Sequence, residues 1–262
     1  MRRKPPYRVI TFILLPLVIV ESAMLIYLWA SRPAKKKAAR PAAIKGKIAI
    51  VIDDWGYNRD NLDIIEQVRY PFTASVLPGL DHTGPVAESL HRMGFEVILH
   101  LPMEPREKCR MEKDTILTSM SEKEIVDIIG RDLADLNYAV GVSNHMGSKA
   151  TEDPKIMAIV FRELKKRRLF FLDSFVSSKS ICSALAGKTG IGFAKRDIFL
   201  DNEEDPGYIK GQLAQLKKKA RSRGYAVGIG HDRRNTLKVL SEMMPQMEKE
   251  GYKFVPVSEL IK

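Results

Sequence analysis

Short apolar segments alternate with segments of helical spacing from Lys47 to the end of the chain. The first segment reads KIAIVIDDWG, and its residues Ile48 to Ile52 are all β-branched or small. An unbroken run of this kind is typical of a strand buried on both faces of a parallel sheet. With the weak segment 191–194 included, the predicted strands cover 48–52, 72–77, 95–99, 138–142, 169–172, 191–194, 225–229 and 253–257.

Helical patterns with recognisable start signals lie between these strands. Ser121-x-x-Glu124 is a capping-box pattern, and Asp153-Pro154 and Asp205-Pro206 each combine an N-cap residue with a proline in the first turn. A final helix, which we expect to kink at Pro245, precedes the last strand. Regular alternation of strand and helix predicts an α/β fold with parallel strands and right-handed crossovers, as a barrel or as a doubly wound sheet.

The polar residues that end these strands favour the barrel. Asp53, Asp54, His100, His145, Asp173 and His231 all lie at or just after the end of a strand pattern. In a (β/α) barrel the carboxyl ends of the strands converge on one face, whereas an open sheet would spread them along an edge. The sequence therefore predicts seven or eight mostly parallel strands around one polar site.

The residue types at these positions suit metal-assisted hydrolysis of an amide or ester. One carboxylate and two imidazoles are ligands for Zn²⁺ or another divalent first-row metal, which makes a water molecule nucleophilic near neutral pH. A second carboxylate next to the ligand could take the proton of that water, and a histidine across the site could protonate the leaving group.

The N-terminal region differs from the rest of the chain. Residues 9–30 are almost wholly apolar apart from Glu21, and a helix of this length spans a bilayer core. We expect an uncleaved signal anchor after a short stub (residues 1–30), since no clear small-x-small cleavage site follows. Residues 31–46, rich in Ala, Lys and Pro, predict a tether to a domain at 47–262.

Charge distribution argues against a nucleic-acid partner. The formal net charge is +11, but residues 1–47 hold eleven of the 43 Lys and Arg and only one of the 32 acidic residues. The remaining chain is close to neutral, so the excess of basic residues lies in the N-terminal region. The two cysteines, Cys109 and Cys182, could pair in an oxidising compartment or remain free thiols.

The domain resembles the divergent polysaccharide deacetylase family, which is related to NodB-type carbohydrate esterases. The matching segments are VIDDWG, ILHLPMEP, GVSNHMGS, FFLDS, FAKRDIFLDN and GIGH, in order over nearly all of residues 47–262. The resemblance implies a distorted (β/α) barrel and deacetylation of a polysaccharide or peptidoglycan-like glycan. It also favours a single-pass protein of the inner (cytoplasmic) membrane with its domain in the periplasm.

The resemblance also implies roles for individual residues. Asp53 and Asp54 match the paired aspartates of the NodB pattern, as base and metal ligand, and His231 resembles the late histidine that acts as general acid. His145 matches the first histidine of the His-x-x-x-His ligand motif, but Lys149 stands where the second is expected. We infer that His100 supplies that ligand. The Arg-x-Pro-Tyr motif is not evident, so Arg196 or Asp173 is the candidate to orient the base.

Purely structural roles are the alternatives for some of these residues. His100 could be a core histidine, Asp173 could cap or hold a loop, and we expect Asp197 and Asp201 to be structural. The first hypothesis is a metal-dependent deacetylase of an amino-sugar polymer, with catalytic Asp53, His231 and Asp173 and with Asp54, His100 and His145 as ligands of a divalent ion, for which zinc is expected. The second, motivated by the missing histidine, is a non-catalytic glycan-binding or envelope interaction protein on the same barrel. A third keeps the site but hydrolyses another ester or amide.

Overall fold

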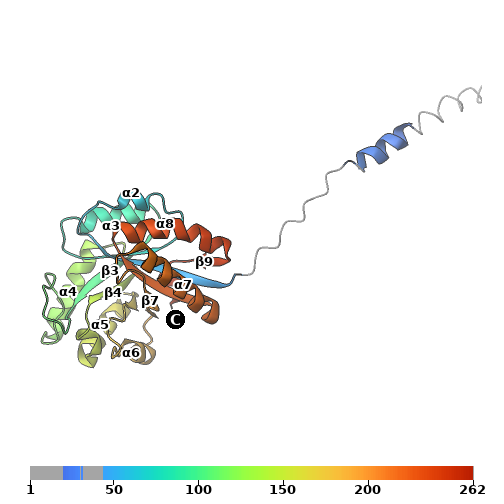
Figure 1. Ribbon diagram of the computed structural model, residues 1–262. Coiled ribbons are helices and arrows are strands. Elements are labelled where there is room, and N and C mark those ends of the chain that lie inside the picture. The colour runs from blue at the N-terminus through green and yellow to red at the C-terminus, as the bar shows by residue number, and fades with distance from the viewer. Residues whose placement is uncertain (1–19, 30, 32–43, 262) are drawn as a thin grey trace, which may run out of the picture. The chain divides into compact units, whose positions relative to one another are not determined.

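The protein is represented by a computed structural model that describes residues 20–29, 31 and 44–261 (Figure 1). Its contacts divide the chain into two compact units, Met1–Ala42 and Ala43–Lys262. Residues 20–29 form a helix. Among the residues that the structure describes, none of the helices has both the length and the apolar character needed to span a bilayer. Most of the span expected at 9–30, and most of the tether expected at 31–46, lie outside the described residues.

The domain alternates strands and helices as the sequence predicts. The strands are β1 (Gly46–Trp55), β2 (Thr73–Val76), β3 (Glu96–Met103), β4 (Gly141–Met146), β5 (Phe170–Asp173), β6 (Phe193–Lys195), β7 (Ile198–Phe199), β8 (Tyr225–His231) and β9 (Tyr252–Phe254). The helices are α2 (Leu62–Ile65), α3 (Thr83–Arg92), α4 (Glu122–Asp135), α5 (Pro154–Lys166), α6 (Cys182–Thr189), α7 (Pro206–Arg223) and α8 (Arg234–Lys249), with 3₁₀ turns at Ala150–Glu152 and Val257–Leu260.

The predicted helix caps are confirmed. The Ser121 side chain accepts a hydrogen bond from the Glu124 backbone, and the Glu124 carboxylate accepts one from the Ser121 backbone N–H. Asp153 and Asp205 cap α5 and α7 through their side chains. Helix α8 continues through Pro245. Both cysteines are free thiols, Cys109 exposed and Cys182 buried.

The strands form one parallel sheet that is curved but not closed. Its order is β6-β5-β4-β3-β2-β1-β8-β7, with β9 paired to β1. Within the described residues β6 and β7 pair with β5 and β8 but not with each other. The expected distorted barrel is therefore a half-barrel, in which eight strands follow one another and β9 pairs with β1 outside this order. The short strand β7, Ile198–Phe199, was not expected from the sequence.

The gap in the barrel is crossed by the chain itself. Arg196 and Asp197 connect β6 to β7, and the Arg196 N–H donates to the carbonyl of Asp173 on β5. The next N–H, of Asp197, donates to the carbonyl of Val227 on β8. A single backbone step thus joins the two edges where a closed barrel would have continuous strand pairing.

Side chains alternate between an outer and an inner face of the sheet, as strand geometry requires. On β1, Ile48, Ile50 and Ile52 pack outward in the large core beneath the helices, which surround the strands in Figure 1. Ala49 and Val51 point inward into a second, smaller apolar cluster. Val255, Val257 and Leu260 of the C-terminal segment fill the same cluster. The interior of the half-barrel is thus packed, and a group of polar residues lies on the inner face near the carboxyl ends of the strands.

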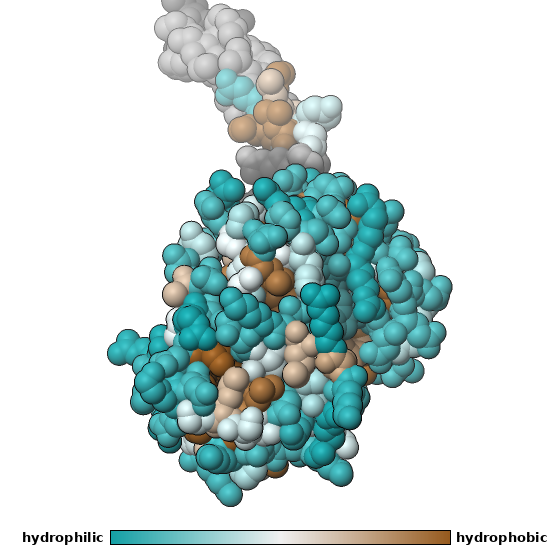
Figure 2. All heavy atoms as spheres, turned by 90° about the vertical axis from the view of Figure 1, so that its left-hand side faces the viewer, coloured by the Kyte–Doolittle hydropathy of each residue, from teal (hydrophilic) through white to brown (hydrophobic). Residues whose placement is uncertain are grey.

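The exterior of the domain is mainly hydrophilic. Figure 2 shows hydrophilic side chains over most of one face, with hydrophobic residues confined to small patches between them. This agrees with a near-neutral domain whose apolar residues are used in the two internal clusters.

Candidate metal site

The inner face collects polar residues from five strands at one end of the sheet. The alternation that buries Ala49 and Val51 inward also turns Asp53 inward, and the same period applies to the other strands. The inward-facing polar residues near the carboxyl ends are Asp53 of β1, Ser75 of β2, His100 of β3, Ser143 and His145 of β4, and His231 of β8. Asp53 and His231 are register partners on neighbouring strands.

Asp54 joins this set through a local break in the strand. Simple alternation would turn Asp54 to the face opposite Asp53. Its backbone φ of 66° is in the left-handed region, and the β1–β2 register shifts between Ile52 and Trp55. Such irregularities re-aim side chains, and a non-glycine residue in this region costs of order 1–3 kcal/mol. Both adjacent carboxylates therefore reach the same site.

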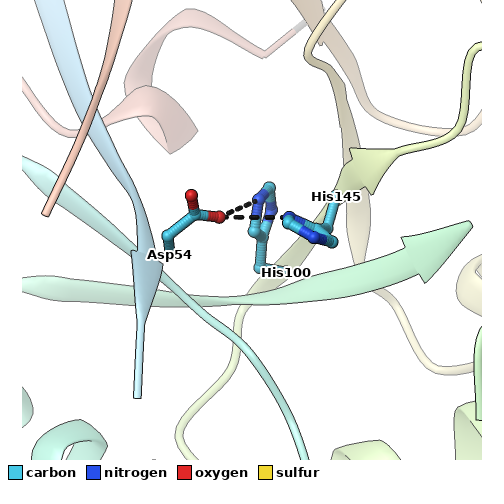
Figure 3. Close-up of side chains that lie close together, drawn as sticks. All are labelled: Asp54, His100 and His145. Atoms are coloured by element: carbon cyan, nitrogen blue, oxygen red, sulfur yellow. Dashed lines mark hydrogen bonds and ion pairs between the residues drawn. The ribbon is translucent and has the colours of Figure 1, made fainter. Parts of the chain in front are cut away.

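Asp54, His100 and His145 form a compact cluster of potential metal ligands (Figure 3). One ligand atom from each lies within 4.8 Å of the other two. Asp54 Oδ1 is 3.3 Å from His100 Nε2 and 3.1 Å from His145 Nδ1. The two imidazole rings meet edge to face with centroids 5.0 Å apart. Three strands thus place one carboxylate oxygen and two ring nitrogens around a common point.

The two adjacent carboxyl groups have opposite pKa shifts. Burial raises the pKa of Asp53, whose Oδ2 lies 3.7 Å from His100 Nε2. Burial also acts to raise the pKa of Asp54, but hydrogen bonds from His100 and His145 outweigh it, so the pKa of Asp54 is lowered. Asp54 is therefore ionised and ready to hold a cation, whereas Asp53 has the higher proton affinity suited to a base.

His231 lies on the strand next to Asp53 and is held by Asp201. The Nδ1 atom of His231 is 2.8 Å from Asp201 Oδ1, and the Asp201 carboxylate also accepts from the His231 backbone N–H and the Thr236 hydroxyl. Burial acts to lower the pKa of His231, but the hydrogen bond and charge of Asp201 prevail and raise it. We expected Asp201 to be structural; its contacts place it instead directly behind the candidate general acid.

Asp173 and Arg196 make their hydrogen bonds to a neighbouring loop. The Asp173 carboxylate accepts from the Phe175 N–H and the Ser180 hydroxyl. The Arg196 guanidinium donates to the carbonyls of Ser174 and Phe175 and lies 3.6 Å from the centroid of the Phe199 ring. These contacts favour the alternative interpretation in which Asp173 holds a loop. No hydrogen bond joins either side chain to Asp53 within the described residues, so orientation of the base by them stays a prediction.

Lys149 is engaged away from the ligand cluster. Its Nζ is 2.6 Å from Glu104 Oε1, and the other Glu104 oxygen accepts from the backbone and hydroxyl of Thr118. Lys149 stands where the second motif histidine is expected, and its side chain forms this ion pair. His100, which arrives from β3, lies in the cluster of potential ligands with Asp54 and His145.

Sequence reasoning missed two hydroxyl groups of the site. Ser75 and Ser143 are fully buried on the inner face, and their hydroxyls are 2.6 Å apart. Ser75 lies inside the apolar segment 72–77 and Ser143 directly follows the segment 138–142, so neither pattern predicts a role for its hydroxyl. The available signal was a polar residue inside a buried strand pattern, which needs a hydrogen-bond partner in the fold.

The residues present fit a divalent cation. Nitrogen and oxygen donors in this number match a zinc site that leaves positions open for water and substrate. Two site atoms, Asp53 Oδ1 and His145 Nε2, are buried and have no hydrogen-bond partner among the described residues. Buried polar atoms are normally satisfied, so these atoms indicate that a further group completes the site.

Comparison with known proteins places the chain in a family. The sequence profile of the divergent polysaccharide deacetylase family matches residues 50–261. An Escherichia coli (strain K12) protein named YibQ is 37% identical over 201 residues, which cover 77% of this chain and 63% of that protein. The match thus spans less than two thirds of the length of this relative.

Two solved structures share the fold. An Agrobacterium tumefaciens protein of uncharacterized function superposes with a TM-score of 0.77 at 23% identity, covering 84% of this chain and 90% of the other. The catalytic domain of a peptidoglycan N-acetylglucosamine deacetylase from Eubacterium rectale superposes with a TM-score of 0.50 at 17% identity, covering 86% and 94%. The half-barrel is consistent with the NodB-like fold, and on the evidence of the profile match the chain belongs to the divergent polysaccharide deacetylase family.

Proposed function

We propose that the domain is a metal-dependent hydrolase that removes N-acetyl groups from an amino-sugar polymer of the cell envelope. The observation that carries this proposal is the Asp54–His100–His145 cluster, with Asp53 and His231 beside it on the same inner face. Membership of a deacetylase family and a fold shared with a peptidoglycan N-acetylglucosamine deacetylase support the choice of an amide on an amino sugar.

The side chains divide the proton transfers between them. Asp54, His100 and His145 would hold the cation, for which zinc is the best match to the donor set. The cation would supply Lewis acidity toward a water molecule and the substrate carbonyl. Asp53 would accept the proton of the attacking water, because its pKa is raised by burial. His231 would donate a proton to the departing amine, since its raised pKa keeps it protonated.

We also propose that the N-terminal segment anchors the protein in the inner membrane, with the domain on the periplasmic side. The apolar pattern of residues 9–30 supports an anchor, and residues 31–46 have the composition of a tether. An envelope glycan as substrate would require the domain on that side. Fractionation of cells should place the full-length chain with membranes and a chain lacking residues 1–42 with soluble proteins; equal fractionation of both would contradict the anchor.

The test of function is acetate release combined with zinc content. Full-length wild-type chain with Zn²⁺ should release acetate from an N-acetylated glycan such as peptidoglycan. Asp54→Ala should lose both zinc and activity while remaining folded, because it removes the carboxylate that joins the two histidines. Asp63→Ala is a matched control, since Asp63 is an exposed aspartate on α2 and its loss should change neither property.

Two results would contradict the proposal. Stoichiometric zinc in Asp54→Ala would remove Asp54 from the ligand set. Glycan binding by the wild type without zinc and without released acetate would favour the alternative, a non-catalytic glycan-binding protein. The observation behind that alternative is Lys149, which stands in the place of one motif histidine and pairs with Glu104.

A further inference from the structure

A chain of buried hydrogen bonds runs behind the candidate ligand His100. The Nδ1 atom of His100 is 2.8 Å from the Ser143 hydroxyl, and that hydroxyl is 2.6 Å from the hydroxyl of Ser75. Ser75 and Ser143 have no exposed surface, and His100 is 2% exposed, so water does not compete for these bonds.

Three neighbouring strands build this chain. His100 on β3 and Ser143 on β4 are register partners, and Ser75 lies on β2 at the other side of β3. All three side chains point to the inner face, because their strand neighbours Leu99, Val142 and Ala74 pack outward. The contact between the two hydroxyls therefore passes across the inner face of β3.

Counting donors and acceptors gives the chain a direction. Each serine hydroxyl has one proton to donate. In the proposed metal site Nε2 of His100 must be unprotonated to bind the cation, so a neutral ring carries its proton on Nδ1. The Ser143 oxygen then accepts from His100, and the Ser143 proton goes to the Ser75 oxygen. The other ring nitrogen, Nε2, is the one that lies 3.3 Å from Asp54 Oδ1 in the ligand cluster.

We infer that Ser143 and Ser75 are positioning residues that keep Nδ1 of His100 protonated and thereby direct Nε2 at the metal. This inference rests on the proposed function for the metal itself. The hydrogen bond also fixes the plane of the ring, which is the usual task of an outer partner of a metal-bound histidine.

The first readout is the protonation of the His100 ring in the full-length chain. Labelling with ¹⁵N-histidine reports each ring nitrogen separately, and His100→Gln assigns the signal among the five histidines. We expect a proton on Nδ1 of His100 both with and without bound Zn²⁺. A wild-type ring with an unprotonated Nδ1 would overturn the inference, and this readout needs no serine variant to fold.

The second readout is the affinity for Zn²⁺, measured by competition with a chelator. Ser143→Ala and Ser75→Ala should each weaken zinc binding by about 10- to 100-fold, the usual effect of losing an outer partner of a ligand. In Ser143→Ala the Nδ1 proton should also exchange faster with solvent. Unchanged affinity together with unchanged proton exchange in Ser143→Ala would overturn the inference.

Thr73→Val is the matched control. Thr73 is a fully buried hydroxyl residue two positions before Ser75 on the same strand, but it bonds Glu96 and the Val257 backbone instead. Its loss should lower stability without altering zinc affinity or the His100 signals. A Thr73→Val effect on zinc as large as that of Ser75→Ala would show that lost packing explains both, and would overturn the inference.

Failure of this inference differs from failure of the proposed function. A wild-type chain that binds no zinc contradicts the metal site, yet its Nδ1 signal still tests the hydrogen-bond chain. A wild-type chain that binds zinc as tightly as its serine variants keeps the metal site and removes only the positioning role.

Discussion

His231 and Asp201 give the clearest residue-level expectation for acid–base chemistry. Asp201→Asn keeps the shape of the side chain but removes the charge that raises the pKa of His231. The pKa of His231 should therefore fall, and the alkaline limb of the activity profile, where the acid loses its proton, should move to lower pH. Because general acid catalysis contributes about 10²–10⁴-fold, activity at neutral pH should fall on the order of 10²-fold.

An NMR titration of the His231 ring measures this shift directly. Asp205→Asn serves as the control, since Asp205 caps α7 and does not contact the ring. An unchanged His231 pKa in Asp201→Asn would contradict the coupling of these two residues.

The sequence predicted the residues of this site unevenly. Asp53, Asp54, His100, His145 and His231 could be found because each interrupts or ends an apolar run, and the parallel fold brings such ends together. The partnership of Asp201 with His231 could not, because it joins residues after β7 and at the end of β8, and β7 itself is only Ile198–Phe199. Its contact depends on how the chain crosses the gap in the barrel.

The strands of the site extend further than their apolar patterns. β3 continues past His100 to Met103, and β4 includes Asn144 and His145, whereas we expected both to stop at the first polar residue. The pairing of Leu101, Pro102 and Met103 with β4 sustains the longer strands. The histidines thus lie within paired strands, where the backbone is more rigid than in a loop. The apolar pattern ends at the first polar residue, but the backbone pairing of the strands continues beyond it. Periodicity in a single sequence does not reveal this continued pairing.

Gly46 lies where β1 packs closely on α7. We expected this residue in the tether, but it begins β1, and a Cβ atom there would lie 2.5 Å from the Ala220 carbonyl oxygen. Gly46→Ala should therefore lower the free energy of unfolding by about 1–3 kcal/mol, because backbone atoms must separate to admit the methyl group. Gly211→Ala on α7 meets no atom within 4 Å and should instead stabilise the domain by about 0.5–1 kcal/mol.

Denaturant unfolding of both glycine variants measures these two effects. Equal stability of Gly46→Ala and the wild type would contradict the close contact between strand and helix.

The sequence of the whole molecule combines a basic N-terminal region with a near-neutral domain. The net charge of +11 suggests a nucleic-acid partner only if the position of the charges along the chain is ignored. The alternation of strands and helices was enough to predict a parallel α/β domain, because the spacing of apolar residues differs between strands and helices. The gap in the half-barrel was not predictable in this way, since it lies at two residues, Arg196 and Asp197, whose N–H groups bond opposite edges of the sheet.

The central claim is that Asp54, His100 and His145 form one metal site, with His100 in place of the missing motif histidine. The measurement that tests it most directly is the zinc content of the purified full-length chain, compared between wild type and His100→Ala after loading and removal of excess metal. We expect close to one zinc per wild-type chain and a large loss in the variant, because His100 Nε2 is one of three potential ligand atoms within 4.8 Å of one another. Absence of zinc from the wild type, or equal zinc in the two proteins, would contradict the account.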